Sequence, residues 1–134
     1  MNMRPTIVCL CGSTRFYEAF QEANYIETMA GKIVLTVGHY PHTTVHGGKV
    51  GCTPHEKYKL DALHLAKIDM ADEVLILNVG GYIGESTARE IAYAAMRGKK
   101  IRYLEAAQFS SPQERSNAES RGPVFVGPES DIGH

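Results

Sequence analysis

The sequence places a carboxylate shortly after a glycine-rich loop, in the stretch G-E-S-T-A-R-E-I-A-Y-A of residues 84–94. Glu90 is expected on the first turn of the helix that this stretch predicts, next to a loop whose backbone a ligand could approach closely. A buried carboxylate can attack the anomeric carbon of a sugar and form a covalent glycosyl ester. The positive end of the helix dipole is expected to keep Glu90 ionised, as a nucleophile must be. Glu90 is therefore our candidate nucleophile.

Glu90 also has an interpretation that needs no ligand. Thr87 precedes it by three residues, and the pair matches a capping box. In a capping box, the Thr hydroxyl accepts a hydrogen bond from the backbone N–H three residues on, and the Glu side chain reaches back to the cap. Glu90 would then only stabilise the first turn of its helix. The sequence leaves both interpretations open.

A second group of polar residues directly follows the apolar run 7–11. Gly12 permits close backbone approach, Ser13 and Thr14 supply hydroxyls, and Arg15 supplies a guanidinium. This set suits a phosphate or carboxylate. It lacks both the Walker lysine and a full G-x-G-x-x-G pattern, so neither ATP nor NAD is favoured. The alternative is that Ser13 or Thr14 caps the next helix and Arg15 lies in solvent.

A third group of side chains gathers imidazoles and one thiol between the second apolar run and the second predicted helix. Its members are His39, His42, His46, Cys52 and His55. Their spacing is not a recognised zinc pattern, so we expect no metal ion, and we expect no cofactor. His39 comes directly after the second apolar run and is a candidate to line a ligand site. The alternative is a plain surface loop.

Hydrophobic patterning assigns these groups to alternating strands and helices. Short apolar runs without alternation predict buried strands at 7–11, 32–37, 73–78 and 100–104. Apolar steps of three and four residues predict helices at 15–29, 54–70 and 86–97. The stretch Thr53-Pro54-x-Glu56 is a strong helix start. In that second helix, the residues expected to face the core are Leu60, Leu63, Ala66 and Met70.

The β-α-β-α-β-α-β order predicts an α/β fold with a parallel sheet covered by helices on both faces. We expect a flavodoxin- or Rossmann-like three-layer sandwich with four to five parallel strands in the order 2-1-3-4. Ligands bind such sheets beyond the carboxyl ends of the strands, at the point where the strand order reverses. Segments 11–15 and 78–90 should meet there. The polar residues 105–134 are expected to form a tail, in which Val124-Phe-Val could add an edge strand.

Composition narrows the functional class. With 134 residues, 43% of them hydrophobic, the chain is expected to form one small domain. Lys plus Arg (14) nearly balance Asp plus Glu (15), so we expect no nucleic-acid polymer as a partner. No apolar stretch approaches the roughly 20 residues that span a bilayer, so no membrane partner is expected. The three cysteines lack a C-x-x-C spacing, which favours a reduced, cytoplasmic protein.

Several of these motifs together resemble one enzyme family. The stretch S-T-A-R-E-I-A-Y-A followed by G-K-K resembles the G-T-A-x-E-x-G-x-A…G-K signature of nucleoside 2-deoxyribosyltransferases and related nucleotide N-glycosidases. The strand end C-G-S-T-R is similar to the C-G-S-x-R of the deoxynucleoside 5′-monophosphate N-glycosidases. The stretch A-D-E-V-L-I-L fits the family's A-D-x-V strand start. The resemblance covers roughly residues 5 to 104 and implies the same α/β fold.

The resemblance implies roles for individual residues. Glu90 corresponds to the family's nucleophile. The transferases carry an Asp six residues before it that contacts the base; Gly84 stands there, with Glu85 beside it. The family's other active-site Asp is matched by Asp61 or Asp69, and we take Asp69 as the candidate catalytic partner.

The remaining candidate contacts divide between the two ends of a nucleotide. The 5′ end or phosphate would be held by Gly12, Ser13, Arg15 and Ser86, and the base by Tyr82 and Glu85. The expected partner is a small-molecule nucleoside or nucleotide, and family members imply a homo-oligomer. Two further hypotheses stay open: a non-catalytic nucleotide-binding module on the same fold, and a metal-dependent hydrolase that uses the histidine segment.

Overall fold

The structure, a computed structural model, describes residues 4–41 and 53–106. His42, His46, Cys52 and the predicted 105–134 tail beyond residue 106 lie outside the described residues. Within the described part, no helix combines the length and the apolar character needed to cross a membrane.

The elements alternate as the sequence predicts. They are β1 (Ile7–Cys11), α1 (Tyr17–Met29), β2 (Ile33–Leu35), α2 (Pro54–Met70), β3 (Glu73–Ile76), the short 3₁₀ helix η1 (Val79–Gly81), α3 (Glu85–Met96) and β4 (Lys100–Tyr103). The strands form a four-stranded sheet in the order β2-β1-β3-β4, and every pair is parallel. The predicted fold class and strand order are confirmed.

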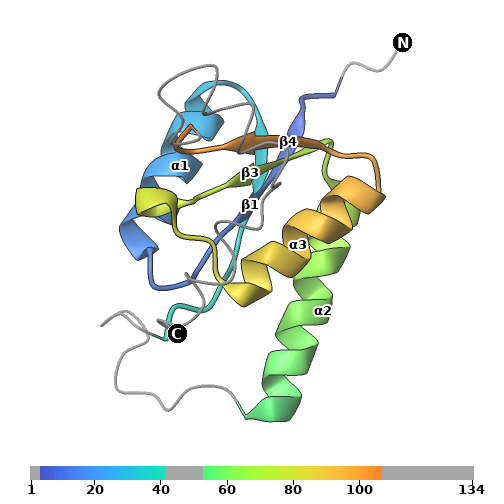
Figure 1. The fold of residues 1–134 in the computed structure, drawn as a ribbon. Helices are drawn as coiled ribbons and strands as arrows, with labels where there is room; N and C mark the ends of the chain where they lie inside the picture. Colours follow the sequence, from blue (N-terminus) through green and yellow to red (C-terminus); the bar gives the residue numbers. More distant parts are fainter. Residues whose placement is uncertain (1–3, 42–52, 107–134) are drawn as a thin grey trace, which may run out of the picture.

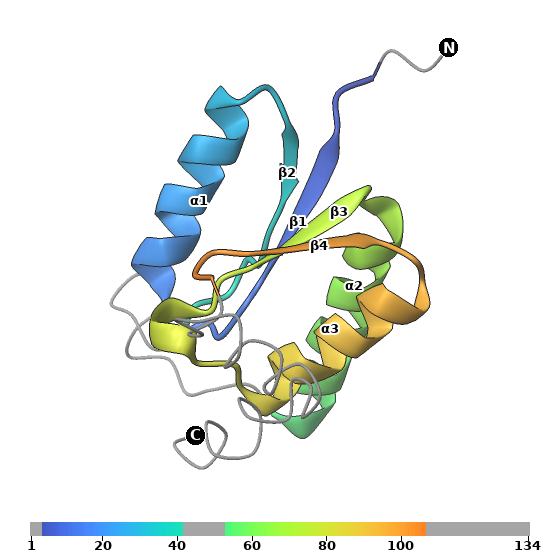
Figure 2. The same cartoon turned by 45° about the horizontal axis from the view of Figure 1, so that its top comes forward.

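The sheet is the middle layer of three. Helix α1 covers one face, while α2 and α3 lie side by side on the other (Figures 1 and 2). Side chains along β1 alternate between these faces because successive residues of a strand point to opposite sides. Val8 and Leu10 pack in the cluster under α1, whereas Cys9 and Cys11 pack in the cluster under α2 and α3. This alternation puts both thiols on the same side of the sheet.

Helix α2 begins where the sequence predicts but turns a different face to the core. Thr53 caps it in a complete capping box with Glu56, and Pro54 occupies the first turn. The expected inward face is wrong: Leu63 is 52% exposed and Met70 is 65% exposed. The residues of α2 that are buried are His64 and Ile68. Periodicity defines an apolar stripe on a helix, but it does not decide which stripe the sheet covers.

An ion-pair network closes the opposite, amino-terminal edge of the sheet. Glu27 and Glu73 are buried, and Arg102 Nη2 lies 2.6 Å from Glu27 Oε1 and 3.1 Å from Glu73 Oε2. Lys32 Nζ bridges the same two carboxylates at 3.2 and 2.8 Å. Buried carboxylates persist only when they are paired in this way. The network ties α1 to β3 and β4, away from the carboxyl ends of the strands.

Candidate active site

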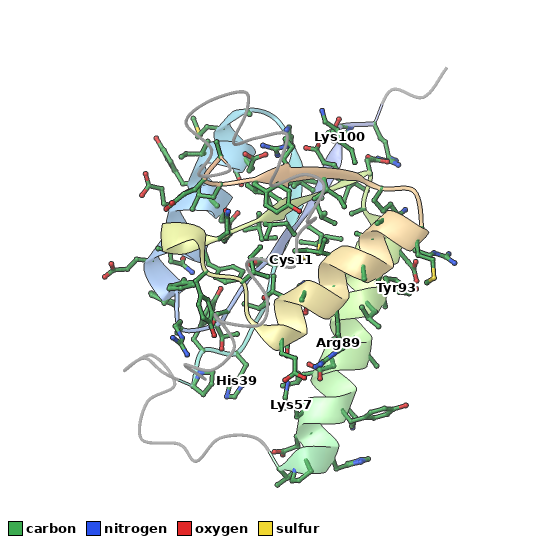
Figure 3. The ribbon with its side chains drawn as sticks, in the orientation of Figure 1. Cys11, His39, Lys57, Arg89, Tyr93 and Lys100 are labelled. Atoms are coloured by element: carbon green, nitrogen blue, oxygen red, sulfur yellow. The ribbon has the colours of Figure 1, made fainter. Side chains whose placement is uncertain are left out.

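A cavity of about 630 Å³ opens at the carboxyl ends of the strands, where the strand order reverses. Three segments build it: the loop after β1, the segment after β2, and the facing parts of α2 and α3. Figure 3 shows His39, Lys57 and Arg89 gathered at this end of the molecule, and Lys100 at the other. The size suits a small organic ligand rather than a lone ion. The sequence prediction of a ligand site at this edge agrees with the position of the cavity.

Glu90 reaches the cavity from the second turn of α3. The helix begins at Glu85, with Gly84 as its N-cap and no side-chain cap hydrogen bond. Thr87 is therefore buried inside the first turn and cannot be the cap of a Thr87–Glu90 box. The capping-box interpretation of Glu90 is wrong. The expectation that Glu90 lies on the first turn is wrong as well.

The surroundings of Glu90 favour its neutral form more than the sequence suggests. Its side chain is 15% exposed, and burial raises the pKa of Glu90 to about 7, with the charge of His64 opposing the shift. The influence of the helix dipole falls off within the first turn, so it does not hold the carboxyl ionised from the second turn. Glu90 is thus poised to change charge near neutral pH.

A histidine that was not predicted as a site residue lies beside Glu90. His64 Nε2 lies 4.0 Å from Glu90 Oε1, 3.4 Å from Cys11 Sγ and 3.6 Å from Cys9 Sγ. All three partners lie on the side of the sheet that α2 and α3 cover. One imidazole nitrogen therefore joins the carboxylate at the cavity wall to two buried thiols below it.

The buried groups of this cluster shift one another's proton affinity. The hydrogen bond from Cys11, followed by contact with His64, lowers the pKa of Cys9 to about 6, against the effect of burial. The same contact with Cys9, together with burial, raises the pKa of Cys11 well above its usual range. Burial lowers the pKa of His64, but contacts with Cys9 and the Glu90 charge outweigh it, and the net shift is upward. Cys9 is the thiol that ionises first.

Most of the predicted substrate-binding residues line the cavity. They are Gly12, Ser13, His39, Gly84, Glu85 and Ser86, together with the candidate nucleophile Glu90. A Cβ at Gly12 would meet both the Cβ and the carbonyl oxygen of Leu77 at 3.2 Å, so the loop passes too close to β3 for a larger residue.

Neither Ser13 nor Thr14 caps α1 with its side chain. The N-cap of that helix is Phe16, and it receives no side-chain hydrogen bond. The Ser13 hydroxyl instead accepts from the Arg15 backbone N–H at 3.3 Å.

Two predicted contacts, Arg15 and Tyr82, lie outside the set of lining residues. The Arg15 guanidinium carbon stands 4.9 Å from the centre of the Tyr82 ring, and Tyr82 packs edge-on against Phe16 at 5.8 Å. A cation over an aromatic face is a favourable contact in its own right. These side chains support the loop after β1 from outside the cavity, rather than contributing to its wall.

The expected catalytic partner Asp69 is also placed elsewhere. Its carboxylate accepts from the Tyr93 hydroxyl at 2.8 Å and pairs with Arg97 Nε at 2.9 Å, on the exposed surface between α2 and α3. Asp69 does not line the cavity, whereas Asp61, the other candidate from the sequence, does. The two residues are eight positions apart, more than two turns, so only one of them can reach the carboxyl edge.

The cavity also has walls that the sequence analysis assigned to the core or did not single out. The apolar side chains that line it are Val37, Pro41, Leu60 and Leu63, and the cationic ones are Lys57 and Lys67. Lys67 Nζ donates to the Thr36 carbonyl at 2.5 Å, which holds its charge beside the segment after β2. Four of these side chains, together with Asp61 and the site histidine, share the pattern 57-60-61-63-64-67 on α2. Steps of three and four residues along α2 could have indicated that one face carries ligand contacts.

No model of a known protein family matches the chain, and no curated protein matches it. The chemistry of the site therefore has to be argued from its own residues. These are a carboxylate that titrates near neutral pH, an imidazole, two thiols, and a cavity whose apolar wall is accompanied by two lysines and by the carboxylates of Asp61 and Glu85.

Proposed function

We propose that the protein cleaves or transfers the N-glycosidic bond of a nucleoside or a nucleoside 5′-monophosphate through a covalent glycosyl-Glu90 intermediate. The observation that carries the proposal is the Glu90 carboxylate, set in the wall of a cavity of about 630 Å³ at the reversal of the strand order. The resemblance of segments 11–15 and 84–94 to the nucleoside 2-deoxyribosyltransferase and nucleotide N-glycosidase family supports the same chemistry.

The proposed reaction has two displacement steps. Glu90 in its ionised form attacks C1′ of the sugar, the C1′–N bond breaks, and the base leaves with the bonding electron pair and takes up a proton from solvent. Water, or an N–H nitrogen of a second base, then attacks C1′, loses its proton to solvent and releases the Glu90 carboxylate. His64, 4.0 Å away and with a raised pKa, stabilises that carboxylate as nucleophile and as leaving group.

The cavity offers distinct surroundings for the two ends of a nucleotide. Leu60 and Leu63 form an apolar wall that suits the flat face of a base. Lys57, Lys67 and the hydroxyls of Ser13 and Ser86 give hydrogen-bond donors suited to a phosphate or a 5′-hydroxyl. Because Arg15 does not line the cavity, the preference for a nucleotide rests on the two lysines.

We also propose that the chain is a homo-oligomer. Apolar side chains stand exposed on the outer surface of α2 and at the end of α3; the most exposed are Tyr58, Met70 and Met96. Between the two helices a groove of about 390 Å³ is lined by Leu65, Tyr93 and Met96, and it borders Glu90. Exposed apolar patches of this kind mark contact surfaces. Sedimentation velocity at several protein concentrations tests this, and a monomer throughout would contradict it.

The competing function is a nucleotide-binding module without catalysis. Two observations favour it: Gly84 stands where the transferases carry an acidic residue, and Glu90 is half protonated at neutral pH because its pKa is about 7. A binding module would tolerate Glu90→Gln with its ligand affinity unchanged, because no covalent bond to the carboxylate is needed.

The decisive experiment follows base release by chromatography. Nucleosides and nucleoside 5′-monophosphates are incubated with the wild type, Glu90→Gln, and a control, Glu22→Gln, which removes an exposed carboxylate of α1. Base release by the wild type and the control but not by Glu90→Gln supports the proposal, and an acceptor base in parallel reactions separates transfer from hydrolysis. No release, with a ligand that still raises Tm, supports the binding module.

A further inference from the structure

The geometry points to a zinc site formed by Cys9, Cys11 and His64, beside the cavity that His64 lines. The three ligand atoms, two Sγ and one Nε2, all lie within 4.8 Å of one another, and all three residues are buried. Two thiolates and an imidazole are a donor set that zinc prefers. The inference stands on this arrangement alone and does not depend on the proposed glycosidase activity.

The spacing of the ligand atoms fits tetrahedral coordination. With Zn–S bonds of about 2.3 Å and Zn–N bonds of about 2.0 Å, sulfur and nitrogen ligands lie roughly 3.5 Å apart across a tetrahedral edge. The observed separations from His64 Nε2 are 3.4 Å to Cys11 Sγ and 3.6 Å to Cys9 Sγ. These two of the three ligand–ligand distances therefore already match a tetrahedral site. Each thiol would give up its proton to solvent when the ion binds.

The fold holds these ligands in place before any ion arrives. Cys9 and Cys11 are two residues apart on β1, so the pleat of the strand points both side chains to the face that α2 covers. His64 contacts both sulfurs from the buried face of α2. Both thiols are on a central strand, paired with β3 through Cys9↔Val74 and Cys11↔Ile76. A rigid strand fixes ligand positions better than a loop does.

Glu90 is the group placed to supply, or to hold, a fourth ligand. His64 and Glu90 both line the cavity, which gives the ion a path to the site, and Glu90 Oε1 lies 4.0 Å from His64 Nε2. A fourth ligand from the carboxylate, or from a water held by it, would complete the tetrahedron. With Glu90 itself as a ligand the site would have four protein ligands, and with a bound water it would have three.

Cobalt titration of the reduced, chelator-treated full chain tests the site. Co²⁺ is the probe because thiolate ligation gives intense near-ultraviolet absorption and tetrahedral geometry gives strong visible bands; Zn²⁺ is then added to displace it. We expect one Co²⁺ per chain with both signatures. Cys9→Ala, Cys11→Ala and His64→Gln should each weaken Zn²⁺ binding by about 100-fold or more. Cys52→Ser, which removes the remaining cysteine of the sequence, is the control and should bind as the wild type does.

Circular dichroism of each variant separates a lost ligand from a lost fold. Should a core cysteine variant unfold, X-ray absorption at the zinc edge of the loaded wild type still decides, because it counts the sulfur neighbours directly. Two sulfurs with at least one nitrogen support the site. The zinc site is overturned if the chain takes up no stoichiometric metal, if the cobalt spectra are octahedral, or if Cys52→Ser abolishes binding. Hydrogen bonds between the thiols and the imidazole would then explain the short contacts.

Discussion

His64 Nε2 on α2 lies 4.0 Å from Glu90 Oε1 on α3, and the two side chains are only 7% and 15% exposed. The same nitrogen contacts both thiols of β1. The protonation state of Glu90 on α3 is therefore linked to groups from two other elements, α2 and β1. This contact places the proposed nucleophile next to a ligand of the proposed metal site, so a change at one is expected to affect the other.

The first prediction concerns the pH dependence of base release. Because Glu90 must be ionised to attack and its pKa is raised to about 7, kcat/KM should rise with pH through about 7 and level off above it. The rate is measured for one nucleotide between pH 5.5 and 9. A profile that stays flat from pH 5.5 to 8.5 would show that a group other than Glu90 controls the reaction.

The second prediction concerns the cost of burying Glu90. A carboxyl whose folded pKa lies above its usual value binds more protons when folded than when unfolded, so its ionisation destabilises the fold as pH rises from about 4.5 to 7. Glu90→Gln should raise Tm at pH 8 and leave Tm nearly unchanged at pH 5. Thermal unfolding of both proteins at the two pH values measures this. An equal change in Tm at both pH values would contradict it.

The third prediction concerns close packing of the loop after β1. In Gly12→Ala the new methyl group meets the Cβ and the carbonyl oxygen of Leu77 at 3.2 Å, so the loop or β3 must shift. We expect a loss of about 1–2 kcal/mol of unfolding free energy and weaker ligand binding. The matched control is Gly38→Ala, which also lies in the cavity lining but whose Cβ meets nothing within 4 Å. Urea unfolding compares the two, and equal losses would rule out packing at Leu77 as the cause.

The fourth prediction concerns the ion-pair network at the amino-terminal edge of the sheet. Burial raises the pKa of Glu73, but pairing with Lys32 and Arg102 lowers it by more, so the net shift is downward. The stabilisation is present above the usual pKa of a Glu and is lost as pH falls below it. Arg102→Met should therefore cost about 2 kcal/mol at pH 7 and much less at pH 3.

A surface pair supplies the control for this network. Lys57→Met breaks the exposed pair with Asp61, whose atoms lie 3.3 Å apart, and should cost at most about 0.5 kcal/mol. Urea unfolding of both variants at pH 7 and pH 3 gives the comparison. The explanation fails if the Arg102→Met loss is as large in acid as at neutral pH.

The fifth prediction joins the two proposals and holds only if both are right. Zinc at the Cys9–Cys11–His64 site would draw the nearby Glu90 carboxylate into its coordination sphere and remove it as a nucleophile. Stoichiometric Zn²⁺ should suppress base release, and a chelator should restore it. Cys11→Ala should resist the inhibition while it still releases base. Zinc that binds without affecting the rate would place the ion too far from Glu90 to ligate it.

Much of the fold follows from local sequence signals. Non-alternating apolar runs gave the four strands, and the right-handed crossovers of parallel strands then leave few topologies, among them the observed order β2-β1-β3-β4. The start of α2 was predictable because Thr53, Pro54 and Glu56 satisfy the first turn through contacts within four residues. The place of the cavity followed from the topology, and the candidate nucleophile singled out by its motif, Glu90, is one of the residues that line it.

The tertiary structure alone decided how side chains from different elements meet. Periodicity could not tell which stripe of α2 the sheet buries, so Leu63 was assigned to the core and His64 was left outside the site, the reverse of what packing produces. Nor could spacing within β1 show that a histidine more than fifty residues away would lie on both thiols. Local hydrogen bonds and apolar patterns are determined by residues that are close in sequence. Burial, and with it the pKa of Glu90, depends instead on which surfaces pack together.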